Sequence, residues 1–463
     1  MIKVILMVIM AVFFSVALLV TWYWRDAVYA PDSLDLIRYF ILLPLGLSFV
    51  LLSPYLLMKW YKQRMDNKAK EHVTESTATL PSEATEYKTE WLHLQVFSAD
   101  AQSVLGKNEN LLDALILLRG PMLDSTLVDG VGNPILSYRM TDLDTGSDID
   151  SSEHAALQQR IYLLLQQQLE QHVETLYCVA QQLKKSACFY ETASAYQYRV
   201  HPAWVDPQAM DDLVEEQQAV VAPLARLDVF NIHLLLSEHL LHRWDEAEST
   251  DQIQVYLQTL GIFAEQIQFH YHYLSKQHSY PDWMEQLKQI EQQHQQISLV
   301  ILADSEIDQA CIDEKIAITP NYIPAEFASS CCISSLEVKV ENLEPIKSVQ
   351  IVLHEDRLVS SLERLKITEL EQYASDQAFV LILDHPANIK TVKTLAQHFA
   401  QTPIEPQHYI YSAPSLGHTD NLSNPFGFML ALQIKEPNYS MVYTVEQPKT
   451  QVFITPMNIN RAQ

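Results

Sequence analysis

Histidines occur in two close pairs that could bind a metal ion or carry protons. His239 and His242 are three residues apart, a spacing that places both imidazoles on one face of a helix. His270 and His272 are two residues apart, so on a helix their side chains diverge. Because no Asp, Glu or Cys stands at a familiar ligand spacing from either pair, we expect neither a metal site nor a cofactor.

Carboxylates and thiols give no clearer pattern. The pairs Asp211-Asp212 and Glu215-Glu216 begin a predicted helix, where their charge suits the helix dipole. Cys331-Cys332 lies in an apolar segment and predicts core packing. The five cysteines form no CxxC and no even disulfide set, which fits a reducing compartment: Cys178, Cys188, Cys311, Cys331 and Cys332.

The segment Ser412–Thr419, Ser-Ala-Pro-Ser-Leu-Gly-His-Thr, carries the most informative motif, together with Phe426–Gln433. It resembles the K-S-x-x-G-H-T signature of the ketoacyl synthase branch of the thiolase fold. Ser298–Ser305 and Ile323–Glu326 are similar to that family's "ADS … PGE" strand pair. The resemblance implies a thiolase-like α/β body with Gly417 and His418 in a vestigial site.

Departures from the motif argue against condensing chemistry. Ala413 stands at the family's Lys position, and no Cys lies in a D-x-A-C-S context. The nearest approximation to an H-G-T-G-T segment is Asp384-His385-Pro386-Ala387, so we add His385 to the vestigial site. We expect His418 to be a turn residue that caps the next helix. The alternative is an acyl-thioester or lipid-processing enzyme that uses His418 with Cys331 or Ser415.

Glycine is scarce, with nine residues where average usage would give roughly thirty. Phosphate-binding loops, nucleophile elbows and dinucleotide-binding turns need glycine for positive φ or close backbone approach. No GxxxxGK[ST], GxGxxG or GxSxG occurs, which argues against nucleotide-driven chemistry.

Apolar periodicity predicts an α/β body with a helical insertion and no repeat at fixed period. The predicted strands are 91–97, 111–118, 134–140, 298–303, 327–338, 347–353, 378–383, 409–412, 429–434, 440–445 and 451–455. The predicted helices are 153–185, 207–221, 252–276, 281–295, 359–374 and 389–400, and 238–242 is also taken as helical.

Two uncharged apolar segments, Val4–Trp24 and Tyr39–Met58, have the length of membrane-spanning helices. The short loop Arg25–Arg38 has no positive excess, whereas five basic residues follow the second span: Lys59, Lys62, Arg64, Lys68 and Lys70. Positive flanks stay in the cytoplasm, so we expect a hairpin in a bacterial inner membrane with both termini cytoplasmic. The alternatives are one anchor plus a buried helix, or a signal peptide cleaved after Ala30, which Pro31 disfavours.

The predicted domains are a transmembrane hairpin (1–70), a linker (71–89), an N-terminal α/β lobe with the insertion (90–296) and a C-terminal α/β lobe (297–463). The first 70 residues carry 8 Lys and Arg against 4 Asp and Glu, so the whole-chain charge of −26 leaves −30 for the remainder. Such a body repels nucleic acid and favours basic or neutral protein surfaces. We expect the partner to bind where the insertion meets the C-terminal lobe.

This order of parts, from about Trp91 to Thr455, resembles the type VI secretion lipase-adapter family. The resemblance implies a non-enzymatic adapter that binds a lipase effector and delivers it to the secretion spike protein. That family has no catalytic residues to carry over. A structural membrane component of a secretion assembly is a further alternative.

The hairpin hypothesis predicts that a reporter fused after Gln463 lies in the cytoplasm, because the basic residues that follow Met58 hold that end inside. Alkaline phosphatase fused there should be inactive, and a cytoplasmic fluorescent reporter should be active. Alkaline phosphatase activity at this fusion point would contradict the predicted topology.

Overall fold

The computed structural model describes most of residues 89–457 and little that precedes them. Before residue 89 it describes only Phe13, Phe14, Val16, Leu18, Val20, Trp22, Arg25, Asp26 and Leu43. Within 89–457 the gaps are 145–152, 196–197, 199–224, 320, 356, 371–379, 384–388, 401, 403, 406–408, 413–415, 419–420, 436–437, 445–446 and 448. The chain forms two units, Met1–Glu86 and Tyr87–Gln463.

Both predicted membrane spans lie almost entirely outside the described residues. Among the residues that are described, no helix has the length and apolar character needed to cross a membrane. The hairpin therefore stays a prediction, as does the helix expected over 207–221.

The second unit is built on one mixed sheet of 11 strands. The strand order is β11-β10-β12-β13-β9-β1-β8-β7-β5-β6, with β2 paired to β1, and β3 and β4 form a separate two-stranded sheet. The strands are β1 Glu90–Ser103, β2 Gly106–Lys107, β3 Met122–Val128, β4 Pro134–Ser137, β5 Val229–Ser237, β6 Ile267–Leu274, β7 Gln296–Ser305, β8 Glu326–Ser335, β9 Lys347–Leu353, β10 Val380–Leu383, β11 Tyr409–Tyr411, β12 Ser440–Tyr443 and β13 Gln451–Pro456.

The sheet consists of two halves with the same connectivity. Outward from the centre, one half runs β1-β8-β7-β5-β6 and the other runs β9-β13-β12-β10-β11. In both halves the outer three strands are parallel and the inner pairs are antiparallel. The halves meet where β1 pairs antiparallel with β9. Along the chain, the first half ends with β8 and the second half begins with β9. This point is later in the chain than the predicted lobe boundary after Gln296.

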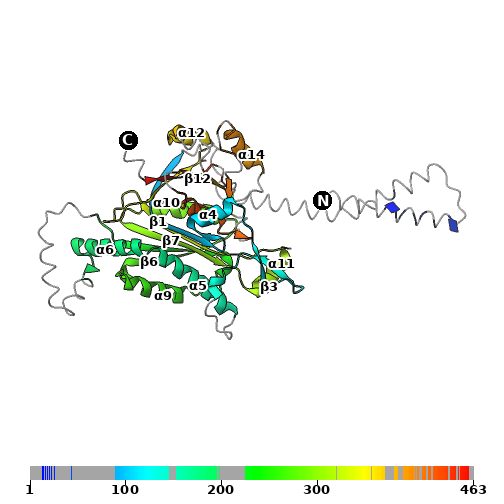
Figure 1. Cartoon of the computed structure of the whole chain (residues 1–463), viewed down its shortest axis with the longest axis horizontal. Coiled ribbons are helices and arrows are strands. Elements are labelled where there is room, and N and C mark those ends of the chain that lie inside the picture. The colour runs from blue at the N-terminus through cyan, green and yellow to red at the C-terminus, as the bar shows by residue number, and fades with distance from the viewer. Residues whose placement is uncertain are drawn as a thin grey trace, which may run out of the picture. The chain divides into compact units, whose positions relative to one another are not determined.

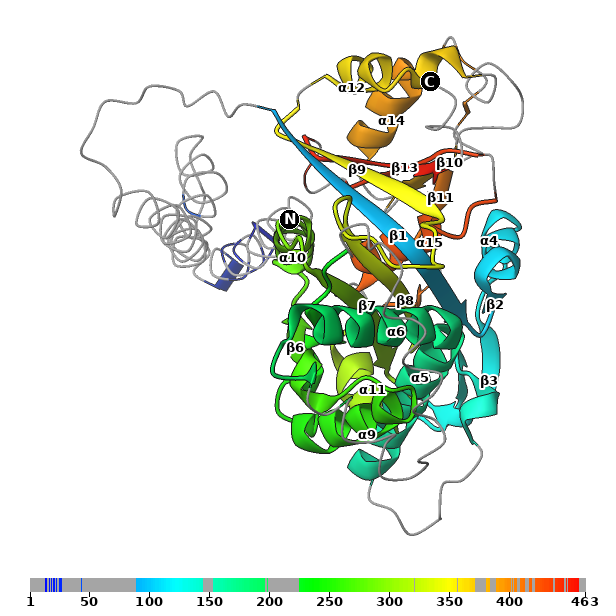
Figure 2. The same cartoon turned by 90° about the vertical axis from the view of Figure 1, so that its left-hand side faces the viewer.

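Helices cover both faces of the sheet. They are α4 Asn108–Ile116, α5 Glu153–Gln171, α6 Val173–Tyr190, α9 Glu246–Thr259, α10 Ser279–Glu291, α11 Gln309–Ile318, α12 Leu358–Arg364, α14 Ile389–His398 and α15 Ser423–Ala431. The cluster on one face takes residues from α4, α10 and α15. On the other face α5, α6 and α9 cover the first half, and α12 and α14 cover the second, at opposite ends of the sheet (Figures 1 and 2).

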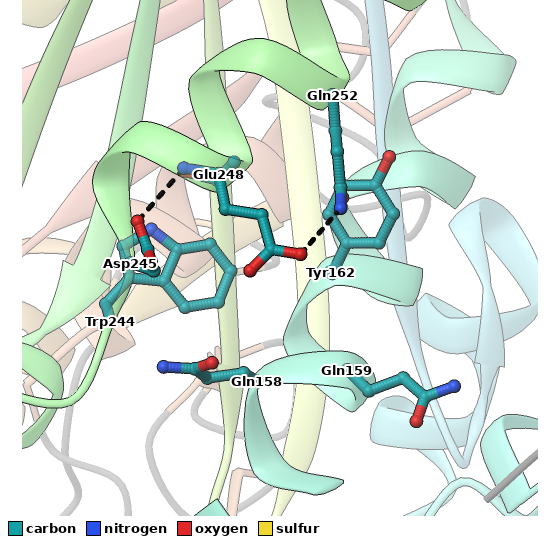
Figure 3. Close-up of a pocket in the computed structure, with 8 residues that line it drawn as sticks. Gln158, Gln159, Tyr162, Trp244, Asp245, Glu248 and Gln252 are labelled. Atoms are coloured by element: carbon teal, nitrogen blue, oxygen red, sulfur yellow. Dashed lines mark hydrogen bonds between the residues drawn. The ribbon is translucent and has the colours of Figure 1, made fainter. Parts of the chain in front are cut away.

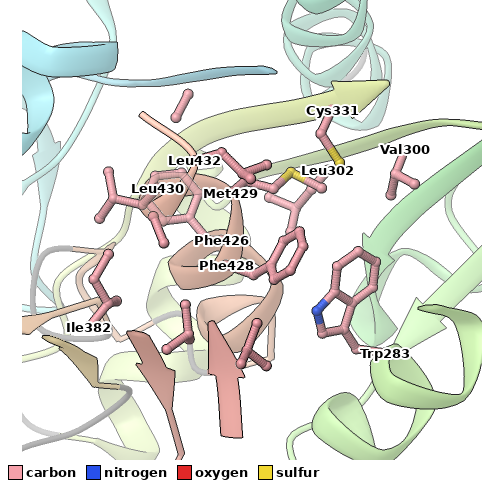
Figure 4. Close-up of a cluster of buried hydrophobic side chains, with 14 of the residues drawn as sticks. Trp283, Val300, Leu302, Cys331, Ile382, Phe426, Phe428, Met429, Leu430 and Leu432 are labelled. Carbon is pink, nitrogen blue, oxygen red and sulfur yellow. The ribbon is translucent and has the colours of Figure 1, made fainter. Parts of the chain in front are cut away.

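The central core lies where α10 and α15 pack together (Figure 4). The Trp283 ring of α10 meets Phe428 of α15 edge to face, with centroids 5.3 Å apart. Strand alternation puts Cys331 in this core and Cys332 in the core of the opposite face, both fully buried and unbridged. The prediction that both cysteines are core residues is confirmed.

Most strands predicted by alternation or an apolar run are confirmed, including β1, β7, β8, β9 and the β12–β13 hairpin. Three assignments were wrong. Residues 111–118 lie largely in α4 and 429–434 begin in α15, because each short apolar segment fits a buried helix as well as a strand. The helix predicted over 252–276 ends at Thr259, and β6 follows.

A buried ion pair fastens α5 to the sheet. Arg160 donates to both carboxylate oxygens of Glu326, at 2.5 and 2.7 Å, and Glu326 is 0% exposed. Ser305 Oγ and the Met140 backbone N–H also donate to Glu326, at 2.7 and 2.8 Å. Burial lowers the pKa of Arg160, but the hydrogen bonds and charge of Glu326 raise that pKa by more than burial lowers it. The guanidinium therefore stays charged.

Arg160→Met should therefore lower the free energy of unfolding by about 3–5 kcal/mol, because it leaves the Glu326 charge buried without a positive partner. The matched control is Lys185→Met, which removes the exposed pair Lys185–Glu341 (2.8 Å) and should cost less than about 1 kcal/mol. Urea denaturation measures both. Equal losses in the two variants would contradict a structural role for the buried pair.

Candidate functional site

Buried ionisable side chains meet at the carboxyl ends of the parallel strands β5 and β7. His239 lies in a 3-10 helix, Glu238–Leu240, that directly follows β5. Asp304 is near the end of β7, and Glu306 follows that strand. Neighbouring parallel strands end at the same edge of a sheet, which brings these residues together. One potential ligand atom from each of His239, Asp304 and Glu306 lies within 4.8 Å of the other two. We call these three residues the His239 cluster.

Glu306 has its charge compensated. Its carboxylate contacts the Lys315 ammonium of α11 and accepts from the Tyr322 hydroxyl, and Lys315 also lies 2.9 Å from that hydroxyl. Burial lowers the pKa of Lys315, but Glu306 raises it by more. Burial and Glu306 together raise the pKa of Tyr322 far above its usual value. The three side chains thus form a unit of one negative and one positive charge.

Asp304 lacks comparable compensation. It is 0% exposed, and neither carboxylate oxygen has a hydrogen-bond partner within the part of the chain that the structure describes. The facing group is His239 Nε2, 3.6 Å from Asp304 Oδ1, and Nε2 is likewise buried without a hydrogen bond there. Burial, assisted by the charge of Glu306, raises the pKa of Asp304 well above its usual value.

The other nitrogen of the His239 ring is fixed by Ser237. Its Nδ1 lies 2.9 Å from Ser237 Oγ, which accepts from Asn421 Nδ2 at 3.0 Å. Ser237, His239 and Asp304 are the residue types of a nucleophilic triad. Ser237 is only 1% exposed, however, so its hydroxyl is not accessible to a substrate in this conformation. These hydrogen bonds orient the imidazole rather than expose a nucleophile.

Gly417 and His418 lie next to this group, as the motif resemblance implies. The His418 ring stacks on Tyr322 with centroids 5.3 Å apart, and its Nδ1 accepts from the Ile323 N–H at 2.9 Å. Gly417 has φ +67°, and a Cβ there would lie 2.3 Å from the Ile323 carbonyl oxygen, so glycine is required. The expectation that His418 caps the next helix was wrong: α15 begins at Ser423 without a side-chain cap, and His418 binds residue 323 instead.

The other groups proposed for the enzymatic alternative do not join His418 among the described residues. Cys331 is fully buried in β8, and burial raises the pKa of its thiol far above the usual value, so it is a poor nucleophile. His385 and Ser415 lie outside the described residues. Asp211-Asp212 and Glu215-Glu216 also lie outside them.

A second group of imidazoles forms where β5 pairs with β6. Because 267–274 is a strand, His270 and His272 project from the same face, and the helical interpretation of their spacing was wrong. His233 lies opposite His270, their rings stack with centroids 4.7 Å apart, and His233 Nδ1 is 3.2 Å from His272 Nε2. Burial and the neighbouring imidazoles lower the pKa of His233 to about 2 and that of His272 to about 4. All three rings are therefore neutral at pH 7.

A pocket of about 280 Å³ lies between α5 and α9 (Figure 3). Its lining residues are Gln158, Gln159, Tyr162, Trp244, Asp245, Glu248, Ser249 and Gln252. We call it the Glu248 pocket. In Figure 3 the Glu248 carboxylate lies between the Trp244 and Tyr162 rings. Asp245 caps α9 by accepting from the Glu248 N–H at 3.0 Å, and Gln252 donates to Glu248 at 3.0 Å.

The lining of the Glu248 pocket favours a cation. It holds two carboxylates and two aromatic rings, and no Lys or Arg is among the lining residues. Burial and the charge of Glu248 raise the pKa of Tyr162. Aromatic faces and carboxylates both attract ammonium and guanidinium groups. The volume is at the lower limit for small-molecule pockets, which suits one side chain better than an acyl-coenzyme A.

Comparisons with known proteins give no activity for this chain. No protein-family model matches the chain, and no curated protein matches it. It is similar to the ketosynthase from module 6 of the bacillaene synthase from Bacillus subtilis 168, with 9% identity, a TM-score of 0.43 and coverage of 79% of this chain and 72% of that one. It is also similar to the ishigamide ketosynthase/chain length factor, with 10% identity, a TM-score of 0.38 and coverage of 78% and 98%.

A third similar structure is 3-oxoacyl-[acyl-carrier-protein] synthase III from Aquifex aeolicus VF5, with 14% identity, a TM-score of 0.27 and coverage of 49% of this chain and 76% of that one. All three structures have TM-scores below 0.5, so they carry no argument about the fold of this chain. At such identities and TM-scores they carry no conclusion about activity, and none of them concerns secretion.

Sequence reasoning located parts of both sites but not their assembly. It singled out His239 and His418 in separate segments, and it missed Asp304, Glu306, Lys315, Tyr322, Trp244 and Glu248 as site residues. A strand assignment for 229–237 would have put His239 at a strand end, where polar residues of parallel sheets gather. The Glu248 pocket has no sequence signal, because it depends on how two helices pack.

Proposed function

We propose that this chain is a non-enzymatic adapter, anchored in the bacterial inner membrane, that binds a lipase effector and delivers it to the type VI secretion spike. The observation that carries the binding role is the Glu248 pocket, which suits a Lys or Arg side chain of a partner protein. The acidic body supports the same role, since long-range attraction speeds encounter with a basic partner. The membrane anchor and the secretion context rest on the sequence features alone.

The state of the nucleophile candidates supports binding over catalysis. Cys331 is buried with a raised pKa, Ser237 is 1% exposed, and the His418 imidazole accepts a backbone hydrogen bond. General base catalysis needs a base within hydrogen-bond reach of an accessible nucleophile. No such pair occurs among the residues that the structure describes in these segments.

Glu248→Gln should weaken binding of the co-purifying effector about 10- to 100-fold, because it removes the charged acceptor for the partner's cation. It should also reduce the dependence of affinity on salt. The control is Glu285→Gln, an equal charge change on α10 away from the pocket, which should alter affinity less than about twofold. Titration calorimetry of the full chain at two salt concentrations measures both effects.

Equal affinities for the native chain and Glu248→Gln, with the same salt dependence, would contradict a role for the Glu248 pocket. Exposed apolar side chains near α4 and β3 would then be the surface to test, since Leu117, Leu118, Met122 and Leu123 are 62–86% exposed.

The second candidate function is an acyl-thioester-processing enzyme, and a specific observation favours it. Buried ionisable groups with shifted pKa values lie beside Gly417 and His418 at the ends of parallel strands, where α/β enzymes place their active sites. The adapter hypothesis and this alternative differ in whether these groups reach a substrate.

The adapter hypothesis predicts that the full chain does not cleave acyl-CoA or acyl-carrier thioesters above background, because no accessible nucleophile adjoins His418 among the residues that the structure describes. Release of free thiol from acetyl-, butyryl- and palmitoyl-CoA measures this. Cleavage that disappears in His418→Ala but persists in His294→Ala, an exposed histidine elsewhere, would overturn the adapter hypothesis in favour of the enzyme.

A further inference from the structure

Two buried polar atoms of the His239 cluster, one on the imidazole and one on a carboxylate, face each other. His239 Nε2 and Asp304 Oδ1 are 3.6 Å apart, and neither has a hydrogen-bond partner among the described residues. A buried carboxylate without a hydrogen bond or a counter-ion is costly, by several kcal/mol or more. The arrangement therefore favours a bound cation between the imidazole and the carboxylate.

The geometry of the cluster matches the needs of a small metal ion. Four-coordinate Zn²⁺ binds imidazole nitrogen and carboxylate oxygen at about 2.0–2.1 Å, so its ligand atoms lie roughly 3.3 Å apart. The separation of 3.6 Å between His239 Nε2 and Asp304 Oδ1 is close to that value. Glu306 supplies a third ligand oxygen within 4.8 Å of the other two. Small side-chain rotations would close the set.

The surroundings of His239 also resemble those of a metal ligand. Ser237 Oγ holds Nδ1 at 2.9 Å, and Asn421 holds Ser237 in turn, so the ring is fixed with Nε2 toward the carboxylates. Metal-binding imidazoles are commonly oriented in this way by a hydrogen bond to the second ring nitrogen.

Charge balance limits which ion fits. Lys315 already contacts Glu306, and the charge of Arg243 also acts on His239, so two cations oppose a metal ion. Two carboxylates and one imidazole nevertheless give a ligand set that suits Zn²⁺ or Mn²⁺ better than Mg²⁺, which avoids imidazole. We propose that His239, Asp304 and Glu306 bind one transition-metal dication, Zn²⁺ by preference, which stabilises the junction of β5, β7 and the Gly417–His418 turn.

The experiment titrates the purified full chain, freed of metal by chelator, with ZnCl₂ and MgCl₂ and follows heat and melting temperature. We expect one equivalent of Zn²⁺ to bind with a dissociation constant below about 1 μM and to raise the melting temperature, while Mg²⁺ does neither. Asp304→Asn and His239→Gln should each weaken Zn²⁺ binding at least 30-fold. Asp304→Asn removes a buried uncompensated carboxylate, so its metal-free form should fold with an unchanged or higher melting temperature.

The matched control is His270→Gln, which alters the other group of histidines, His233, His270 and His272, and should leave Zn²⁺ binding unchanged. Loss of Zn²⁺ binding in His270→Gln and not in Asp304→Asn would assign the ion to those histidines and overturn the proposal. Absence of Zn²⁺ binding to the native chain would overturn it as well. Neither result bears on the adapter role, because the Glu248 pocket shares no residue with the His239 cluster.

Discussion

The antiparallel pairing of β1 with β9 is the constraint on which the rest of the body depends. β1 is the first strand of the body, yet it lies at the centre of the sheet, with Glu90–Val96 paired to β9 and Leu94–Ser103 paired to β8. Alternation places Leu94 and Val96 in one core and Phe97 in the other, and the register irregularity between Val96 and Ser98 then returns Ala101 to the first core. The long strand β1 thus joins two halves of equal connectivity, and its side chains pack into a different hydrophobic core on each face of the sheet.

The equal connectivity of the halves explains where the chemistry collects. Each half ends in three parallel strands, and the polar residues that follow parallel strands gather at one edge. In the first half this edge carries His239, Asp304 and Glu306. The His418 turn of the second half reaches the same place: His418 stacks on Tyr322, whose hydroxyl donates to Glu306, and His418 Nδ1 accepts from the Ile323 N–H. Glu306 and Ser237 are held there by hydrogen bonds, whereas the Asp304 oxygens have no hydrogen-bond partner among the described residues.

The two polar regions of the body have different physical characters. The His239 cluster is largely buried. Its Glu306 is paired with Lys315, and its Asp304 faces His239. The Glu248 pocket is open, carries net negative charge and presents aromatic faces. An enclosed cluster stabilises a fold, whereas an open acidic pocket can recognise a partner. This contrast is the physical basis of the proposed binding role.

The sequence by itself determined the elements whose pattern is local. Alternation predicted β1, the apolar segments predicted β7 and β9, and helical spacing predicted α5, α6 and α10, because each pattern reports which faces are buried. The predicted α/β body also agrees with the observed sheet and its covering helices. Short apolar segments such as 111–118 and 429–434 were misassigned, since burial on all sides erases the difference between helix and strand periodicity.

Only the tertiary structure decided how these parts meet. The pairing of β5 with β6 turned His270 and His272 to one face and added His233, which no spacing along the chain could show. The equal connectivity of the halves has no visible sequence period, because it lies in strand order and direction rather than in side chains. Asp304 and His239 are far apart in sequence, and their uncompensated contact exists only because parallel strands end side by side. The sequence specifies which residues are buried, and long-range pairing selects which of them become neighbours.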